Sequence, residues 1–248
     1  MSLPFLQNYL GLSSGLQTRQ ASTFNKTGNK AWYDFRETTG NLLNHASGAD
    51  TMGTNADLTA SGTITKTANA WNFSSTDGKA IETATDALAG TFSAYTLNCW
   101  IKPASTRAAY TFILTANDGN TNNFNSINTT AGGKIQGAVS GVGGTQIVIE
   151  STTSYSTSVM QMVTSVYDAS LSGTARLKIY FNGTSEGTAS GTPDATYTTG
   201  TKIAGVAVQG TSGQPQYTGI FYDGSIWSRA LSASEITTLY NGGTPLAL

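Results

Sequence analysis

The stretch Phe221-Tyr-Asp-Gly-Ser-Ile-Trp-Ser-Arg-Ala-Leu-Ser-Ala-Ser-Glu-Ile-Thr-Thr-Leu-Tyr-Asn-Gly-Gly243 places an apolar strand directly before a short helix. Ser232 and Glu235 form a capping box, in which the serine caps the first helical turn and the glutamate reaches back to the serine backbone. Asn241-Gly242-Gly243 ends the helix, because Asn and Gly accept the left-handed conformation at a helix C-terminus. We expect this helix to plug one end of a β-structure. Its apolar stripe is Ile236, Leu239 and Tyr240.

Upstream, the clearest strand covers residues 95–102 and ends at Pro103. Its alternation puts one set of side chains on a single face, which we predict to lie between two sheets: Tyr95, Leu97, Cys99 and Ile101. Asn182-Gly183 is typical of a two-residue hairpin turn. We expect polar loops at 117–130 and 183–201. Further predicted strands are 110–115, 133–139, 146–150, 160–167, 176–181, 201–208 and 219–227.

The composition excludes several classes of protein. Of the 248 residues 38% are hydrophobic and 10% aromatic, too many for a disordered chain, and the net charge of −1 argues against a nucleic-acid partner. One Cys and one His cannot form an internal disulfide or a Cys/His zinc site. The sequence has no apolar run long enough for membrane insertion and no signal peptide, so we expect synthesis in a cytoplasm.

Four segments resemble the laminin-G-like domains of the concanavalin A-like lectin/glucanase superfamily. The stretch 221–243 resembles the closing strand and helix of that family, and Trp32-Tyr33-Asp34-Phe35, followed by Thr39-Gly40, resembles its opening strand. Residues 95–103 and 160–183 resemble two further strand regions, although Met160 stands where the family often has Trp. The resemblance covers roughly residues 30–245 and implies an all-β fold: a two-sheet antiparallel jelly-roll sandwich with one short C-terminal helix. Members bind glycans, bind proteins, hydrolyse β-glucans or build assemblies.

Residues 1–29 lie outside this resemblance and are predicted to form an N-terminal arm before a single domain at 30–248. Five large apolar side chains fall within eight residues of the arm: Leu3, Phe5, Leu6, Tyr9 and Leu10. Exposed together, they would form an unusual apolar patch. We expect the arm to contact another protein chain, either a second copy or a shell protein. The alternative is an arm that folds back onto its own domain.

The sequence gives little support for catalysis. The family's glucanases use carboxylates in an alternating Glu-x-Asp-x-Glu pattern, whereas the only close acidic pairs here are Asp34/Glu37 and Glu82/Asp86. The only histidine, His45, is interpreted as a surface-loop residue, and Cys99 as a buried apolar side chain. We therefore predict that the protein is not an enzyme.

The sequence suggests two kinds of binding site, one for a glycan and one for calcium. Aromatic rings stack on sugars and amides fix hydroxyl groups, so a glycan site is predicted from Trp100, Asn98, Tyr180 and Trp227. Asp118, Asn120 and Asn122 resemble the start of a calcium loop, although Thr129 stands at the twelfth position, where an EF-hand has Glu. A polar hairpin loop is the favoured interpretation of that segment. We expect no cofactor, with calcium as the open alternative.

These features favour a non-enzymatic, lectin-like structural or adhesion protein on a virion surface, such as a bacteriophage capsid decoration, fibre or tail accessory protein. The apolar arm and the nearly uncharged composition, rich in Thr, Ser, Asn and Gly, motivate that setting. Host surface glycans are further expected partners. The alternative is a soluble or cell-surface carbohydrate-binding module, and a glucanase-type glycoside hydrolase ranks third.

Overall fold

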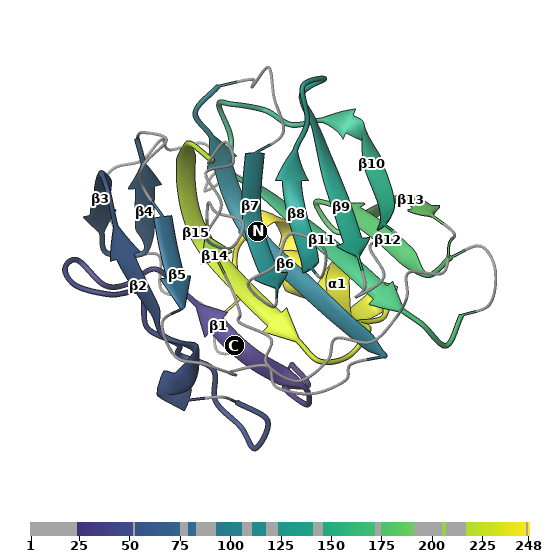
Figure 1. The fold of residues 1–248 in the computed structure, drawn as a ribbon, viewed down its shortest axis with the longest axis horizontal. Helices are drawn as coiled ribbons and strands as arrows, with labels where there is room; N and C mark the ends of the chain where they lie inside the picture. Colours follow the sequence, from purple (N-terminus) through teal and green to yellow (C-terminus); the bar gives the residue numbers. More distant parts are fainter. Residues whose placement is uncertain are drawn as a thin grey trace, which may run out of the picture.

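The computed structural model describes residues 24–51, 53–74, 79–82, 93–105, 111–117, 124–140, 146–171, 175–189, 191, 205–206, 217–246 and 248. Within them the chain forms two antiparallel sheets packed face to face, with one short α-helix behind one of them (Figure 1). The predicted all-β sandwich is confirmed. Among the described residues, no helix combines the length and the hydropathy that a bilayer span requires.

The larger sheet, sheet B, has eight strands in the order β13-β12-β11-β6-β15-β4-β3, and β1 also pairs with β15. Strand β15 is central: it pairs with β6 along its whole length, while its other edge is shared by β4 and β1. The strands are β1 Asn29–Tyr33, β3 Ile64–Thr67, β4 Ala70–Phe73, β6 Ala94–Pro103, β11 Gln161–Asp168, β12 Leu177–Phe181, β13 Thr184–Ala189 and β15 Gly219–Trp227.

The smaller sheet, sheet C, has seven strands in the order β10-β9-β8-β7-β14-β5-β2. Strand β8 of this sheet lies within 117–130, and β13 of sheet B lies within 183–201, both of which the sequence predicted to be polar loops. The strands of sheet C are β2 Leu58–Ser61, β5 Lys79–Glu82, β7 Thr111–Asn117, β8 Phe124–Thr129, β9 Lys134–Ser140, β10 Gln146–Ser154 and β14 Gly205–Val206. A 3₁₀ helix, η1 Gly53–Ala56, precedes β2.

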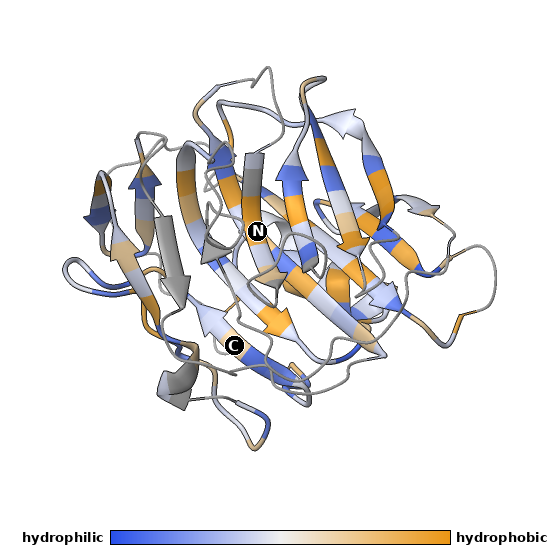
Figure 2. Ribbon diagram, in the orientation of Figure 1, coloured by the Kyte–Doolittle hydropathy of each residue, from blue (hydrophilic) through white to orange (hydrophobic). Residues whose placement is uncertain are grey.

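The main core lies between the sheets. Leu97, Cys99 and Ile101 of β6 are at most 1% exposed and belong to one apolar cluster with Ile127 and Ile135 of sheet C. Figure 2 shows the alternation of polar and apolar residues along the strands that creates this inner face. Tyr95 is buried too, in a smaller cluster that includes Val139 and Ile147. The predicted inward face of β6 is therefore confirmed.

The helix α1 (Ala233–Tyr240) has the predicted capping box, with both reciprocal hydrogen bonds between Ser232 and Glu235. Its predicted position was wrong. Ile236 and Leu239 do not plug an end of the sandwich but pack with Trp100 and Trp227, which face away from the main core. The helix therefore adds a third layer on the outer face of sheet B, and η2 (Asn241–Gly243) follows it.

The described chain begins before the predicted domain boundary at residue 30. Phe24 packs edge-on against Trp227, with ring centroids 5.5 Å apart, and belongs to the same outer cluster as Leu248. Residues 24–29 are thus part of the sandwich. The five apolar arm residues, Leu3 to Leu10, lie outside the described residues.

Candidate functional site

The residues predicted to bind glycans are buried on the outer face of sheet B, and their three aromatic rings belong to the cluster that α1 completes. Trp100 is 2% exposed and stacks on Tyr240, with centroids 5.7 Å apart and planes inclined by 7°. Trp227 is fully buried, and Tyr180 lies in the same cluster. Asn98 accepts a hydrogen bond of 2.7 Å from Thr164. The prediction was wrong because the helix covers this face of sheet B and leaves no ring for a sugar to stack on.

The other sequence candidates are the calcium ligands and Cys99. Asp118, Asn120 and Asn122, the predicted calcium ligands, lie outside the described residues. Cys99 is fully buried, and burial raises the pKa of its thiol far above the ordinary value. A thiol that stays protonated is a poor nucleophile, so Cys99 packs as the sequence predicted.

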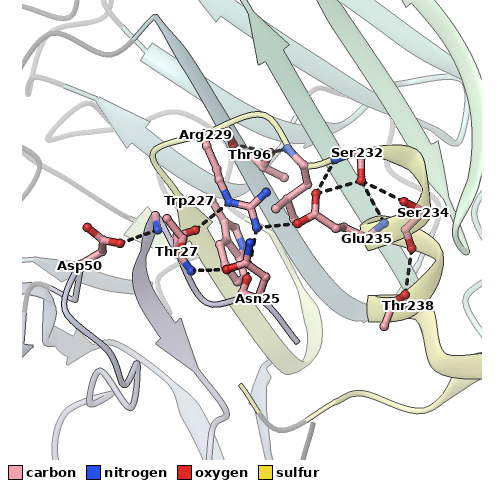
Figure 3. A network of polar contacts seen from close by, with 12 residues as sticks. Asn25, Thr27, Asp50, Thr96, Trp227, Arg229, Ser232, Ser234, Glu235 and Thr238 are labelled. Atoms are coloured by element: carbon pink, nitrogen blue, oxygen red, sulfur yellow. Dashed lines mark hydrogen bonds and ion pairs between the residues drawn. The ribbon is translucent and has the colours of Figure 1, made fainter. Parts of the chain in front are cut away.

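A polar network ties the start of the described chain to the strand and helix at its end (Figure 3). The Arg229 guanidinium donates to the Thr27 carbonyl at 2.7 Å, to the Asn25 carbonyl at 3.1 Å and to Glu235 Oε1 at 2.7 Å. The Gly28 N–H donates to Asp50 at 2.8 Å. Every partner in this network is a protein group, so we interpret it as structural.

The outer face of sheet C carries a row of polar side chains across three neighbouring strands. Ile127 and Ile135 point into the core, so alternation directs Asn128 of β8 and Gln136 of β9 outward. The Asn128 Nδ2 donates to Gln136 Oε1 at 3.3 Å, and Gln136 Nε2 lies 3.5 Å from Glu150 Oε1 on β10. We call Asn128, Gln136 and Glu150 the amide row.

The amide row is satisfied only in part. Asn128 and Gln136 are 4% and 6% exposed, while Glu150 is exposed, so the row opens to solvent at β10. The buried Asn128 Oδ1 and the neighbouring Ser126 Oγ have no hydrogen-bond partner. Buried polar atoms are normally paired, and these two oxygens have unused capacity to accept hydrogen bonds.

A second polar cluster lies beside the end of β1. Suitable ligand atoms of Asp34, Glu37 and His45 all lie within 4.8 Å of one another. His45 Nε2 is 2.5 Å from Glu37 Oε1 and 3.7 Å from Asp34 Oδ1. The side chains of Asp34 and Glu37 are 2% and 10% exposed, and that of His45 is 22% exposed. We call these three residues the acid–histidine cluster.

Local backbone geometry builds the acid–histidine cluster. Phe35 has a φ of +55°, which turns the chain sharply between Asp34 and Glu37. The His45 N–H donates to the Trp32 carbonyl at 2.8 Å, which places the loop beside β1. His45 lies in a loop and is partly exposed, as the sequence predicted, but its ring also lies against two carboxylates, which the sequence did not indicate. The close Asp34/Glu37 pair was the only signal that could have indicated the cluster.

The two carboxylates of this cluster do not form a convincing hydrolase pair. Their nearest ligand oxygens lie within 4.8 Å of each other, which is compatible with the ~5–5.5 Å between the carboxyl groups of retaining glycosidases. However, Asp34 is almost wholly buried, and its Oδ2 accepts from Arg36 Nε at 2.6 Å. A catalytic carboxyl must reach the glycosidic bond, and Asp34 is covered and already bound to a cation.

A family model described as the concanavalin A-like lectin/glucanases superfamily matches residues 73–237. No curated protein sequence matches the chain.

Several solved structures have a similar fold. The receptor-binding domain of botulinum neurotoxin C/D mosaic serotype aligns over 88% of this chain and 52% of its own, with 16% identity and a TM-score of 0.66. The receptor-binding domain of botulinum neurotoxin D aligns over 88% of this chain and 53% of its own, with 15% identity and a TM-score of 0.64. A Trypanosoma rangeli sialidase in complex with sialic acid aligns over 86% of this chain and 32% of its own, with 11% identity and a TM-score of 0.59. The chain thus spans about half the length of the toxin domains, and these identities establish likeness of fold alone.

Proposed function

The chain belongs to the concanavalin A-like lectin/glucanases superfamily, and on that premise we propose that it is a non-enzymatic adhesion domain that binds glycans. The observation that carries the proposal is the amide row on the outer face of sheet C. Side-chain amides donate to and accept from sugar hydroxyls, carboxylates accept from them, and few such groups suffice to fix a ligand's orientation.

The open end of the amide row gives the proposed contact a location. Glu150 is exposed on β10, where Val148, also outward-facing, is 44% exposed and offers an apolar surface. A sugar there would place hydroxyl groups on Glu150 and an apolar ring face on Val148, while the buried Gln136 holds the Glu150 carboxylate in position. Two of the similar folds are receptor-binding domains of botulinum neurotoxins, and this likeness supports a recognition role.

A glycan array probed with the full chain tests the binding proposal. We expect at least one glycan class to bind, with an affinity reduced at least about tenfold, or by about 1.4 kcal/mol, in Glu150→Gln and Gln136→Ala. Asp168→Asn, an acid at the end of β11 on sheet B, is the control and should bind normally. A folded chain that binds no glycan would overturn the function, whereas unchanged binding by both row variants would overturn only the location.

The absence of catalysis has its own test. Asp34, the more deeply buried carboxylate of the acid–histidine cluster, is held by Arg36. We expect no release of reducing ends from β-glucans or bacterial polysaccharides. Turnover that disappears in Glu37→Gln would contradict this part of the proposal.

We further propose a virion surface as the setting, on two features of the sequence. The charge is nearly balanced, and Leu3, Phe5, Leu6, Tyr9 and Leu10 form an apolar segment suited to docking on another protein chain. Deleting residues 2–16 should leave the sandwich folded and abolish particle binding or self-assembly. An unfolded deletion variant would instead assign the segment to the domain's own core and favour a free carbohydrate-binding module.

A further inference from the structure

We propose that Asp34, Glu37 and His45 bind a transition-metal ion of the Zn²⁺ type, with one imidazole nitrogen, two carboxylate oxygens and one open coordination position. The site lies at the end of β1, away from the amide row on β8, β9 and β10. It is therefore independent of the proposed glycan contact.

The spacing of the three ligand atoms suits such an ion. In a tetrahedral zinc site with bonds of about 2.0–2.1 Å, neighbouring ligand atoms lie roughly 3.3 Å apart. His45 Nε2 is 3.7 Å from Asp34 Oδ1 and 2.5 Å from Glu37 Oε1. An ion would draw the first pair together by about 0.4 Å and separate the second by about 0.8 Å, shifts within the reach of side-chain rotation.

A second observation points to a missing cation. The side chain of Glu37 is 10% exposed, and its Oε2 is a buried atom without a hydrogen-bond partner. Leaving a carboxylate oxygen buried and unpaired is costly, because the charged group has lost its water. A metal ion held between Glu37 and His45 would bind this carboxylate and compensate the charge of its buried oxygen.

Surrounding groups hold the three ligands in place. Arg36 binds Oδ2 of Asp34, which leaves Oδ1 directed at His45. The Trp71 indole donates to the Glu37 carbonyl at 2.7 Å, and the Trp32 carbonyl accepts from the His45 backbone. Outer contacts of this kind orient ligands in metal sites.

The donor set also selects the metal. Calcium and magnesium prefer oxygen ligands, whereas imidazole suits zinc and neighbouring transition metals. The two carboxylates supply two negative charges, of which Arg36 offsets one, so the cluster retains an affinity for a divalent cation. Lys66 is the other basic group that interacts electrostatically with Glu37, and its amine donates a hydrogen bond to the Gly40 carbonyl.

The histidine content of the chain makes the test specific. His45 is the only histidine, so the imidazole nitrogen signals in a two-dimensional ¹H–¹⁵N NMR spectrum of untagged full-length protein report on this site alone. Titration with ZnCl₂ should shift the Nε2 resonance and saturate at one equivalent. CaCl₂ at the same concentrations should leave the resonance unchanged.

Isothermal titration of variants with ZnCl₂ completes the experiment. His45→Gln and Glu37→Gln should each weaken zinc binding at least about tenfold, while the control Asp168→Asn should bind as the parent does. Far-ultraviolet circular dichroism of each variant checks that it is folded. Zinc binding that is equal in His45→Gln and the parent, or a His45 resonance that responds to pH but not to zinc, would overturn the proposal and leave the cluster an ion pair.

Discussion

Replacing Arg229 by alanine should destabilise the domain by about 1.5–3 kcal/mol at pH 7, at roughly 0.5–1 kcal/mol for each of its three contacts. Those contacts are two backbone carbonyls before β1 and the Glu235 carboxylate at the start of α1. The side chains of Arg229 and Glu235 are each 24% exposed, so we use the low range for partly solvated ion pairs. Urea denaturation followed by tryptophan fluorescence measures the loss.

The pH dependence separates the ion pair from the carbonyl contacts. The hydrogen bond from Arg229 lowers the pKa of Glu235 from 4.5 to about 2, and bonds from Ser232 assist it. A carboxyl with a lowered folded-state pKa stabilises fully above its unfolded value, and that contribution disappears as the pH falls toward 2. The deficit of Arg229→Ala should therefore shrink by about 0.5–1 kcal/mol between pH 7 and pH 2.5.

A double-mutant cycle with Glu235→Gln provides the control, because glutamine retains the capping interaction with Ser232. We expect a coupling energy of about 0.5–1 kcal/mol between Arg229 and Glu235 at pH 7. A coupling indistinguishable from zero, together with a deficit that does not change with pH, would refute the assignment of Arg229 as an electrostatic link between the start of the chain and the helix.

Three further predictions concern the sandwich itself. Leu97→Ala should lower the free energy of unfolding, measured by urea denaturation, by about 2–5 kcal/mol. The control Val159→Ala, at a side chain 56% exposed, should change it by no more than about 0.5 kcal/mol. Equal losses in the two variants would contradict the inward placement of Leu97. Gly219→Ala should lower the melting temperature strongly, because an added Cβ would lie 2.5 Å from the Lys102 carbonyl of β6. An unchanged melting temperature would show that β15 and β6 separate easily at this position. Cys99 should react with a thiol reagent only at the rate of unfolding, and rapid labelling of folded protein would mean that the core opens locally.

The sequence predicted the elements whose signals are local. The alternation of 95–102 and the capping box at Ser232 depend on neighbouring residues, and both are confirmed. Strand β8 was missed because Phe124-Asn-Ser-Ile-Asn-Thr129 is mostly polar, and only Ile127 of its inner face is a large apolar residue. The polarity of this segment indicated a loop, whereas its pairing with β7 on one edge and with β9 on the other makes it a central strand of sheet C.

The candidate sites depended on long-range packing, which the sequence did not provide. Alternation along 95–102 puts Trp100 on the face away from Cys99, but nothing local indicated that Trp227 shares that face or that α1 would cover it. Two large aromatic residues on neighbouring strands were the signal that a further layer was required. The proximity of Asp34, Glu37 and His45 depends on the left-handed turn at Phe35 and on the hydrogen bond from the His45 N–H to the Trp32 carbonyl, and a count of Cys and His reveals neither.

The pairing of β1 with β15 has a consequence for biosynthesis. Almost two hundred residues separate these strands, and β15 also supplies the second neighbour of β6. A ribosome would therefore release β1 and β6 long before their partner is made, and both would carry open hydrogen-bonding edges during that interval. The sparse charge of this chain gives those edges little electrostatic protection. Closure of the sandwich should thus be a late event, completed only after translation has passed Trp227.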